Sequence, residues 1–239
     1  MNPKPGFEQY WSSRGDGYGT AINRWATSHA AALVAYGSAR LGLTPNQVTL
    51  MSLVCGMVGF LLAFGLPVSQ PVISISVIVI LAELTFILDC ADGLLARATD
   101  TATPCGEYID HTLDIASQSC ALGAFFVFAY RAELSLQNPG LANAAPVVGF
   151  LFLAARITRH TAIHLSGSLF GPQTTAQRSK RSILSRLLTN LLEYQVSMIA
   201  VVAYLLSPTA SLAIFGAQAL MCAAAVARRI VRAMNPERI

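Results

Sequence analysis

The chain has 239 residues, of which 54% are hydrophobic and 12% charged, and its mean hydropathy is +0.54. This composition excludes an ordinary soluble domain, because the apolar residues fall into long blocks that are typical of membrane spans. The net charge is +4, and the five scattered cysteines contain no C-x-x-C pair, which argues against a zinc or disulfide framework. We therefore predict an all-α integral membrane protein.

Residues 1–43 are expected to form a cytosolic N-terminal segment. The first twenty residues are polar and glycine-rich, and they contain no apolar stretch of the kind found in a signal peptide. Residues 21–41 carry apolar side chains such as Trp25 and Leu33, but too many polar ones for a confident span. We expect an amphipathic helix along the cytosolic membrane interface. Packing of this helix against the transmembrane bundle is the alternative.

Residues 44–230 are predicted to form a domain of six transmembrane helices, and residues 231–239 a cytosolic tail. Thr44, Pro45 and Gln47 combine a helix cap, a proline at the first helical position and a capping-box glutamine, so a helix begins here. Apolar blocks of suitable length mark each span. The spans are expected at residues 48–66, 72–89, 106–130, 144–163, 187–206 and 210–226.

The positions of the basic residues predict the topology. Six spans place both termini on the same side of the membrane. Of the sixteen Lys and Arg residues, only Arg131 then falls on the opposite side. The positive-inside rule therefore places the termini and the basic loop 166–186 in the cytosol. A multi-pass protein of the cell membrane is expected.

The most informative stretch follows the second predicted span. Seven of the twelve acidic residues lie between Glu83 and Asp114. Asp89 and Asp92 are three residues apart, and Asp110 and Asp114 are four apart. Each pair therefore shares one face if its segment is helical.

The linker between these two pairs predicts how they meet. The second span must continue as a helix beyond the lipid to carry Asp92 and Arg97. Residues 98–105 lie between the two helices, and this stretch ends with Thr103 and Pro104, a cap followed by a first-position proline that marks a helix start. Two helices hinged in this way aim four carboxylates at one point on the cytosolic side.

Four carboxylates at one point stay ionised only if cations join them. Their hard oxygen ligands, without a Cys/His ligand set, favour Mg²⁺ or Mn²⁺ over zinc. Two such ions would balance the four charges and form a clamp suited to displacement at phosphorus. Gly93, Ala96 and Gly106 add no bulk to the same faces, and Arg97 supplies a fixed charge for a phosphate. For a single Asp pair, a solvated and chemically idle loop is the alternative.

Eight residues in this stretch carry a family resemblance. The pattern D-x2-D-G-x2-A-R-x8-G-x3-D-x3-D resembles, without departure, the signature of the CDP-alcohol phosphotransferases. The resemblance implies a six-helix membrane enzyme, often a homodimer, with a divalent-metal site that opens to the cytosol. The matching residues are Asp89, Asp92, Gly93, Ala96, Arg97, Gly106, Asp110 and Asp114.

The resemblance also implies an activity. Enzymes of this family cleave the diphosphate of a CDP-linked donor, release CMP and transfer the substituted phosphate to an alcohol. By resemblance, the four Asp residues bind the metal ions, and Asp114 is also a candidate base. Gly93, Ala96, Arg97 and Gly106 would hold the CDP. The expected partners are the donor, a polar alcohol, membrane lipid and a second copy of the chain, with no nucleic acid.

Glu107 and His111 form a second candidate pair. They are four residues apart, and a carboxylate that orients an imidazole is suitable for general-base chemistry near neutral pH. The string TPCGEYIDHTLD also resembles eukaryotic choline/ethanolamine phosphotransferases, in which the matching Glu and His are implicated in deprotonating the diacylglycerol hydroxyl. A histidine that simply satisfies a carboxylate beside the metal site is the alternative.

Asn46 and Thr49 are candidates for contact with the nucleotide, because they begin the first span near the cytosolic surface. Helix capping is the alternative role for both.

A separate basic group is predicted to form a pocket for a phosphorylated acceptor. Its members are Arg156, Arg159, Arg178 and Lys180.

These basic residues differ in their alternatives. Arg178 and Lys180 lie in a basic loop, where topological anchoring and contact with lipid phosphate compete with the pocket. Arg156 and Arg159 lie deeper in the fourth span, which favours the pocket.

Two donor–acceptor combinations remain open. A CDP-diacylglycerol donor with a small polar alcohol fits Arg156 and Arg159, whereas a CDP-aminoalcohol donor with diacylglycerol fits Glu107 and His111. The first is preferred.

Two other classes of protein are more distant alternatives. A membrane prenyltransferase would need a second, distant Asp-rich motif, and the chain has no Asp after Asp114. A divalent-cation transporter would need acidic residues at mid-depth in several spans.

Overall fold

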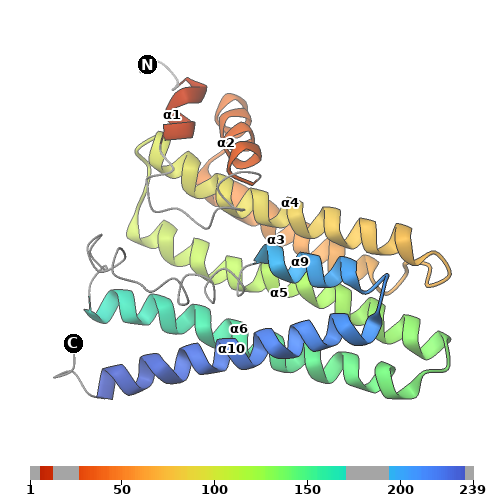
Figure 1. Cartoon of the computed structure of the whole chain (residues 1–239). Helices are drawn as coiled ribbons and strands as arrows, with labels where there is room; N and C mark the ends of the chain where they lie inside the picture. Colours follow the sequence, from red (N-terminus) through yellow and green to blue (C-terminus); the bar gives the residue numbers. More distant parts are fainter. Residues whose placement is uncertain (1–5, 13–26, 171–193, 235–239) are drawn as a thin grey trace. The chain divides into compact units, whose positions relative to one another are not determined.

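The computed structural model describes residues 6–12, 27–170 and 194–234, which lie in helices or in the turns between them (Figure 1). The part of the chain so described contains no strand, which confirms the all-helical class. Five helices are long and apolar enough to cross a membrane. They are Pro45–Leu62, Pro71–Ala98, Pro104–Ser135, Pro139–Ile163 and Pro208–Val231.

The chain forms two compact units, residues 1–128 and 129–239, each of which is considered by itself. The first unit contains most of the predicted site. Its helices are α1 (Phe7–Ser12), α2 (Ser28–Leu41), α3 (Pro45–Leu62), α4 (Pro71–Ala98) and most of α5 (Pro104–Ser135).

The two helix starts predicted at Thr-Pro pairs are confirmed. Thr44 and Gln47 form a reciprocal capping box, in which the Thr44 backbone N–H donates to Gln47 Oε1 at 2.8 Å. At α5, Thr103 Oγ1 accepts a hydrogen bond of 3.0 Å from the Gly106 backbone N–H. These bonds satisfy backbone donors that lack partners in the first turn of a helix, so they fix where α3 and α5 begin.

Helices α4 and α5 are longer than a bilayer requires. Their 28 and 32 residues correspond to about 42 and 48 Å at about 1.5 Å per residue, whereas the hydrocarbon core is about 30 Å thick. The acidic residues lie toward the C-terminal end of α4 and the N-terminal end of α5. Both helices can therefore carry them beyond the lipid, as predicted.

The turn between α4 and α5 has a defined geometry. The Thr101 N–H donates to Ala96 O at 2.9 Å and the Asp100 N–H to Arg97 O at 3.4 Å, which is the Schellman pattern of helix termination. Asp100 has φ +56°, the left-handed conformation that this pattern needs at its turning residue. The turn stops α4 at Ala98 and directs the chain toward Pro104.

Helix α3 packs closely on α4 in antiparallel register. Ser52 Oγ donates to Thr85 O at 2.9 Å, and Cys55 Sγ lies 3.5 Å from Leu81 O. A Cβ on Gly59 would lie 3.4 Å from the Leu81 side chain. Small side chains at this contact allow the backbones to approach, and the hydroxyl adds a bond across the helices.

The N-terminal helices pack on the same unit. Both α1 and α2 contact α4, and the buried face of α2 is rich in alanine. Tyr10 is fully buried, and its ring meets Tyr36 edge-on at 5.9 Å. The predicted alternative for this region, packing against the bundle, is thus what the contacts of α2 show. Its position at a membrane interface remains a prediction, and residues 21–26 lie outside the described part.

The second unit contains the rest of the chain. Its helices α6 (Pro139–Phe170) and α10 (Pro208–Met234) contact each other, with Phe152 and Phe215 ring to ring at 5.0 Å. Helix α9 (Tyr194–Ala203) covers only ten residues of the predicted fifth span, and residues 187–193 of that span are outside the described ranges. Six spans therefore remain a prediction.

Candidate metal centre

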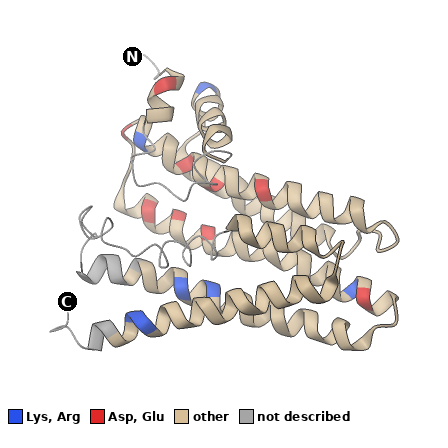
Figure 2. Ribbon diagram, viewed as in Figure 1, with Lys and Arg blue, Asp and Glu red and all other residues tan. Residues whose placement is uncertain are grey.

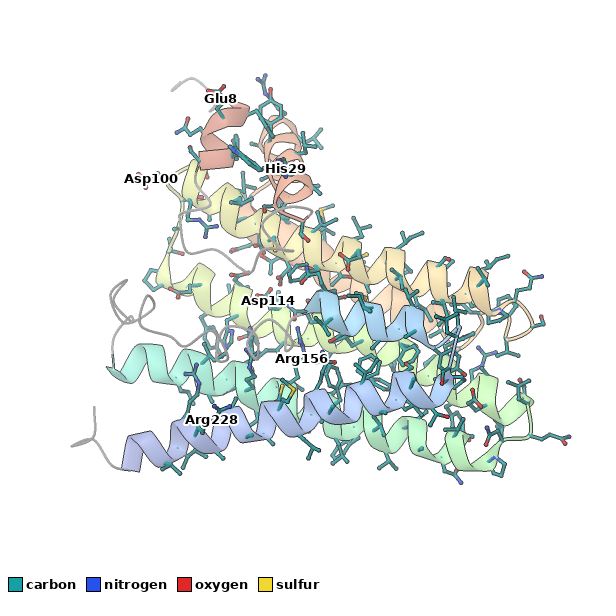
Figure 3. The ribbon with its side chains drawn as sticks, in the orientation of Figure 1. Glu8, His29, Asp100, Asp114, Arg156 and Arg228 are labelled. Carbon is teal, nitrogen blue, oxygen red and sulfur yellow. The ribbon has the colours of Figure 1, made fainter. Side chains whose placement is uncertain are left out.

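Three of the four predicted metal ligands come together in the first unit. Asp92 on α4 and Asp110 and Asp114 on α5 each offer a carboxylate oxygen, and these oxygens lie within 4.8 Å of one another. Figure 2 shows acidic residues along both helices, and Figure 3 labels Asp114 on α5. The hinge at residues 99–103 is what brings the two helix faces together.

The residues present fit a divalent cation. Asp92 is only 2% exposed, and Asp110 and Asp114 each have a buried Oδ1 without a hydrogen-bond partner. A buried carboxylate oxygen without a donor is costly unless a cation is present. Mg²⁺ holds oxygen ligands at about 2.1 Å in an octahedron, so two ligands of one ion are about 3 Å apart when adjacent and about 4 Å apart when opposite. The three carboxylate oxygens, within 4.8 Å of one another, are close to that range.

Asp89 lies beside this cluster. It is half-buried and three residues before Asp92, and its side chain interacts with that of Asp114 across the helices. Gln118 Nε2 lies 3.4 Å from Asp89 Oδ2. The Asp89 carboxylate is thus near the cluster of three, with a donor from α5 on one oxygen.

Asp92 receives hydrogen bonds from two directions. The Thr49 hydroxyl on α3 donates to Asp92 Oδ2, and the Gly93 backbone N–H donates to Asp92 Oδ1. Thr49 is 2% exposed, so the contact is buried. Thr49 was predicted to contact the nucleotide; in the structure its hydroxyl contacts a predicted metal ligand.

The residues predicted to hold CDP lie around the cluster. Arg97 is exposed at the end of α4, and a Cβ on Gly93 would lie 3.2 Å from Arg97 Nη1, so the guanidinium lies across Gly93. Its positive charge also acts on Asp110. Ala96 is half-buried on the same helix.

Gly106, in the first turn of α5, lies close to the first turn of α3. A Cβ at this position would lie 3.1 Å from Thr103 Oγ1 and 3.7 Å from Asn46 Oδ1. The exposed Asn46 therefore lies close to Gly106, as expected if both face one ligand. A Cβ at residue 106 would crowd the Thr103 hydroxyl and would be in ordinary van der Waals contact with Asn46.

The predicted Glu107–His111 pair lies on α5 with the metal ligands. Glu107 is exposed and its charge acts on Asp110, while His111 is half-buried. The pair therefore adjoins the carboxylate cluster, and a direct role in proton transfer remains a prediction.

The predicted acceptor residues are in the second unit or outside the described part. The Arg156 guanidinium lies 5.7 Å from the centre of the Tyr194 ring, and Arg156 and Arg159 both act electrostatically on Cys222 of α10. Figure 3 labels Arg156 on α6. Arg178 and Lys180 lie outside the described residues, so the four-residue pocket remains a prediction.

Sequence reasoning missed Gln118. Its signal was nevertheless present, because Asp110, Asp114 and Gln118 recur every four residues and so follow one face of α5. The Thr49–Asp92 bond had no such signal, since it depends on the register between two helices.

Comparison with protein-family models gives one match that covers most of the chain. Residues 42–230 match the model described as CDP-alcohol phosphatidyltransferase. A direct sequence comparison with curated proteins finds no match. The matched region contains the whole carboxylate cluster and its neighbours Thr49 and Gln118.

Proposed function

The chain belongs to the CDP-alcohol phosphatidyltransferase family, and we propose that it transfers a phosphatidyl group from CDP-diacylglycerol to a small polar alcohol and releases CMP. Family membership gives the general class, which is head-group transfer in phospholipid synthesis. The observation that supports the proposal most strongly is the meeting of Asp92, Asp110 and Asp114 beside Arg97 and Gly93.

The proposed ligand roles follow the geometry. Asp92, Asp110 and Asp114, with Asp89 beside them, would hold one or two Mg²⁺ or Mn²⁺ ions. When bound, such ions neutralise a diphosphate and stabilise negative charge on a departing phosphate. Arg97 would hold phosphate oxygens through two of its guanidinium N–H donors. Gly93, Ala96, Gly106 and Asn46 would line the nucleotide.

The proposed reaction is a displacement at phosphorus. The acceptor hydroxyl oxygen forms a new bond to the phosphorus that carries diacylglycerol. The bond from that phosphorus to the bridging oxygen breaks, and CMP leaves with the electron pair. The hydroxyl proton passes to Asp114 or to His111, whose orientation Glu107 would fix. The products are a phosphodiester lipid and CMP.

The proposed architecture is a six-span protein of the cell membrane, with residues 44–230 as the catalytic domain. The N-terminal segment, the tail at 231–239 and the carboxylate cluster would face the cytosol, where CDP-linked substrates are made. Helix α2 would lie at the interface, and two chains would form a homodimer. Arg156 and Arg159, with Arg178 and Lys180, would bind a phosphorylated acceptor.

A second donor is favoured by one specific observation. Glu107 adjoins the carboxylate cluster on α5 in a sequence similar to that of the choline/ethanolamine enzymes. The alternative function is therefore transfer of an aminoalcohol phosphate from its CDP derivative to diacylglycerol. The two functions differ in which substrate carries CDP, so one assay can separate them.

The test is CMP release by the purified protein in detergent. We expect release that requires Mg²⁺ or Mn²⁺ and occurs with CDP-diacylglycerol and one member of a panel of polyols, phosphorylated polyols and amino alcohols. Release only with a CDP-aminoalcohol and diacylglycerol would establish the alternative. Asp92→Asn is expected to abolish release while the protein still elutes as a folded species. Wild-type turnover in that variant would remove the metal-site assignment.

A further inference from the structure

Two side chains outside the family motif contact carboxylates in or beside the cluster. Thr49 on α3 donates to Asp92, and Gln118 on α5 lies within hydrogen-bond distance of Asp89. The two come from different helices and reach opposite ends of the i, i+3 pair on α4.

The Thr49 contact is the shorter and more buried of the two. Thr49 and Asp92 are each 2% exposed, and the Thr49 hydroxyl also lies 3.1 Å from Pro45 O of its own helix. The hydroxyl has one proton to donate. A bond to an ionised carboxylate is stronger than one to a backbone carbonyl, so Asp92 is the favoured acceptor.

The packing of α3 explains why Thr49 reaches Asp92. From Asp92 toward the N-terminus of α4, further contacts with α3 join Ser52 to Thr85 and Cys55 to Leu81. The register is thus continuous over several turns. A Cβ on Gly56 would lie 2.5 Å from Ser117 O of α5, so glycine also brings α3 close to the second acidic helix. The Thr49 hydroxyl is consequently placed by the whole helix contact.

We propose that Thr49 and Gln118 are positioning residues that orient Asp92 and Asp89 and so set the affinity of the cluster for divalent ions. The inference rests on the proposed function, because it takes the cluster to be a metal site. Each donor contacts one carboxylate oxygen and limits rotation of the side chain, which would leave the remaining lone pairs available to a bound ion. Outer partners of this kind typically change metal affinity by about 10- to 100-fold when removed.

The first test compares three threonine variants. Thr49→Val removes the hydroxyl without loss of volume, and Thr49→Ser keeps it. Thr85→Val is the matched control, because Thr85 is also fully buried on α4 near the α3 contact but donates to Leu81 O of its own helix at 2.8 Å. The readout is Mn²⁺ binding, measured from the electron paramagnetic resonance signal of free Mn²⁺ without donor or acceptor.

We expect Thr49→Val to raise the Kd for Mn²⁺ by about 10- to 100-fold, Thr49→Ser to restore most of the affinity, and Thr85→Val to bind as wild type does. Equal affinity of Thr49→Val and wild type would overturn the inference. A loss in Thr85→Val as large as that in Thr49→Val would also overturn it, since the effect would then be one of packing. Elution volume and thermal unfolding in detergent establish that each variant is folded.

The second test removes the Gln118 amide. Gln118→Leu is expected to raise the Kd for Mn²⁺ by about 10-fold, at the low end of the range, because its contact of 3.4 Å is long for a hydrogen bond. In both Thr49→Val and Gln118→Leu, CMP release should recover as Mn²⁺ is raised, since the ligands themselves remain. Unchanged Mn²⁺ affinity in Gln118→Leu would remove Gln118 from the proposal.

The outcomes separate this inference from the proposed function. If wild type binds Mn²⁺ and Thr49→Val binds it weakly, the inference holds even if no CMP is released, and the proposed function alone fails. If CMP release is metal-dependent but the variants bind Mn²⁺ as wild type does, the inference alone fails. A wild-type protein that binds no Mn²⁺ would overturn the inference.

Discussion

Single side chains determine what the acidic cluster can bind. Asp110 and Asp114 each hold a buried oxygen without a donor, whereas both oxygens of Asp92 accept hydrogen bonds, from Thr49 and from the Gly93 backbone. The cluster therefore combines one carboxylate held by hydrogen bonds with two whose buried oxygens a cation would satisfy. Charges buried in this way are otherwise strongly unfavourable.

Gly93→Ala tests the nucleotide side of this arrangement. The new Cβ would lie 3.2 Å from Arg97 Nη1, so the guanidinium would have to shift by a few tenths of an ångström, and the Cβ would add bulk where the proposed nucleotide lies. Loss of one charge-assisted hydrogen bond is equivalent to about 1.5 kcal/mol, so the KM for the CDP donor should rise about tenfold. Steady-state kinetics at saturating metal measures it.

The control for that substitution is Gly216→Ala on α10, where a Cβ would meet nothing within 4 Å. Mn²⁺ affinity should be unchanged in both variants, because neither alters a predicted ligand. A Gly93→Ala enzyme with an unchanged KM would contradict a close fit of the donor against Gly93 and Arg97.

Contacts between helices position these side chains. The sequence predicts where the helices start but not how they pack against one another. The starts of α3 and α5 followed from Thr44-Pro45 and Thr103-Pro104, because capping is local. The Asp spacing likewise predicted which carboxylates share a face. The Thr49–Asp92 bond was not predictable, since it depends on how far α3 slides along α4, which distant contacts such as Ser52 with Thr85 decide.

Gly56→Ala tests the α3–α5 contact. A Cβ only 2.5 Å from Ser117 O must push the helices apart, and overpacking of this kind typically costs about 1–3 kcal/mol of unfolding free energy. Thermal unfolding in detergent should show lower stability, and CMP release should fall because Thr49 moves with α3. Stability equal to that of Gly216→Ala would contradict the close contact.

Tyr204→Phe tests a second buried contact, far along the chain from the Asp cluster. The Tyr204 hydroxyl donates to Glu133 Oε1 at 2.6 Å, and Asn138 Nδ2 donates to Glu133 Oε2 at 3.2 Å, so the 2% exposed Glu133 is held on both oxygens. Removal of the hydroxyl leaves a buried carboxylate oxygen short of a donor, which costs about 1–3 kcal/mol.

Thermal unfolding in detergent is again the measurement. Tyr130→Phe is the control, because Tyr130 is 40% exposed and so contributes little through its hydroxyl. If Tyr204→Phe unfolds at the temperature of wild type, the Glu133 contact contributes nothing to stability. Mn²⁺ affinity should be unaffected in both variants.

Across the entire chain, hydropathy predicted the membrane class and most of the spans. Five of the predicted spans correspond to helices that are apolar and long enough, although the first of these helices ends at Leu62 and not at residue 66 as predicted. Helix α9 shows only Tyr194–Ala203 of the remaining span. Helix ends were predicted less well. Asp100 and Gln137 end α4 and α5 in the left-handed conformation, which favours glycine and gives little signal in other residues.

Labelling of single cysteines tests the proposed topology. Cys105 is exposed in the first turn of α5, and Ser135 is exposed at its last residue. The helix is about 48 Å long, so the two ends should lie on opposite sides of the membrane. In a background without other cysteines, a membrane-impermeant maleimide should label Ser135→Cys in intact cells and Cys105 only after permeabilisation. The reverse pattern would invert the topology.

The central claim is that carboxylates from α4 and α5 meet over a divalent ion that binds the diphosphate of a CDP-linked substrate. Anomalous diffraction at the manganese edge, from crystals grown with Mn²⁺ and CDP, tests it most directly. The account predicts an anomalous peak in bonding contact with Asp92, Asp110 and Asp114 and with a phosphate oxygen of CDP. Bound CDP with no manganese at these three residues would contradict it.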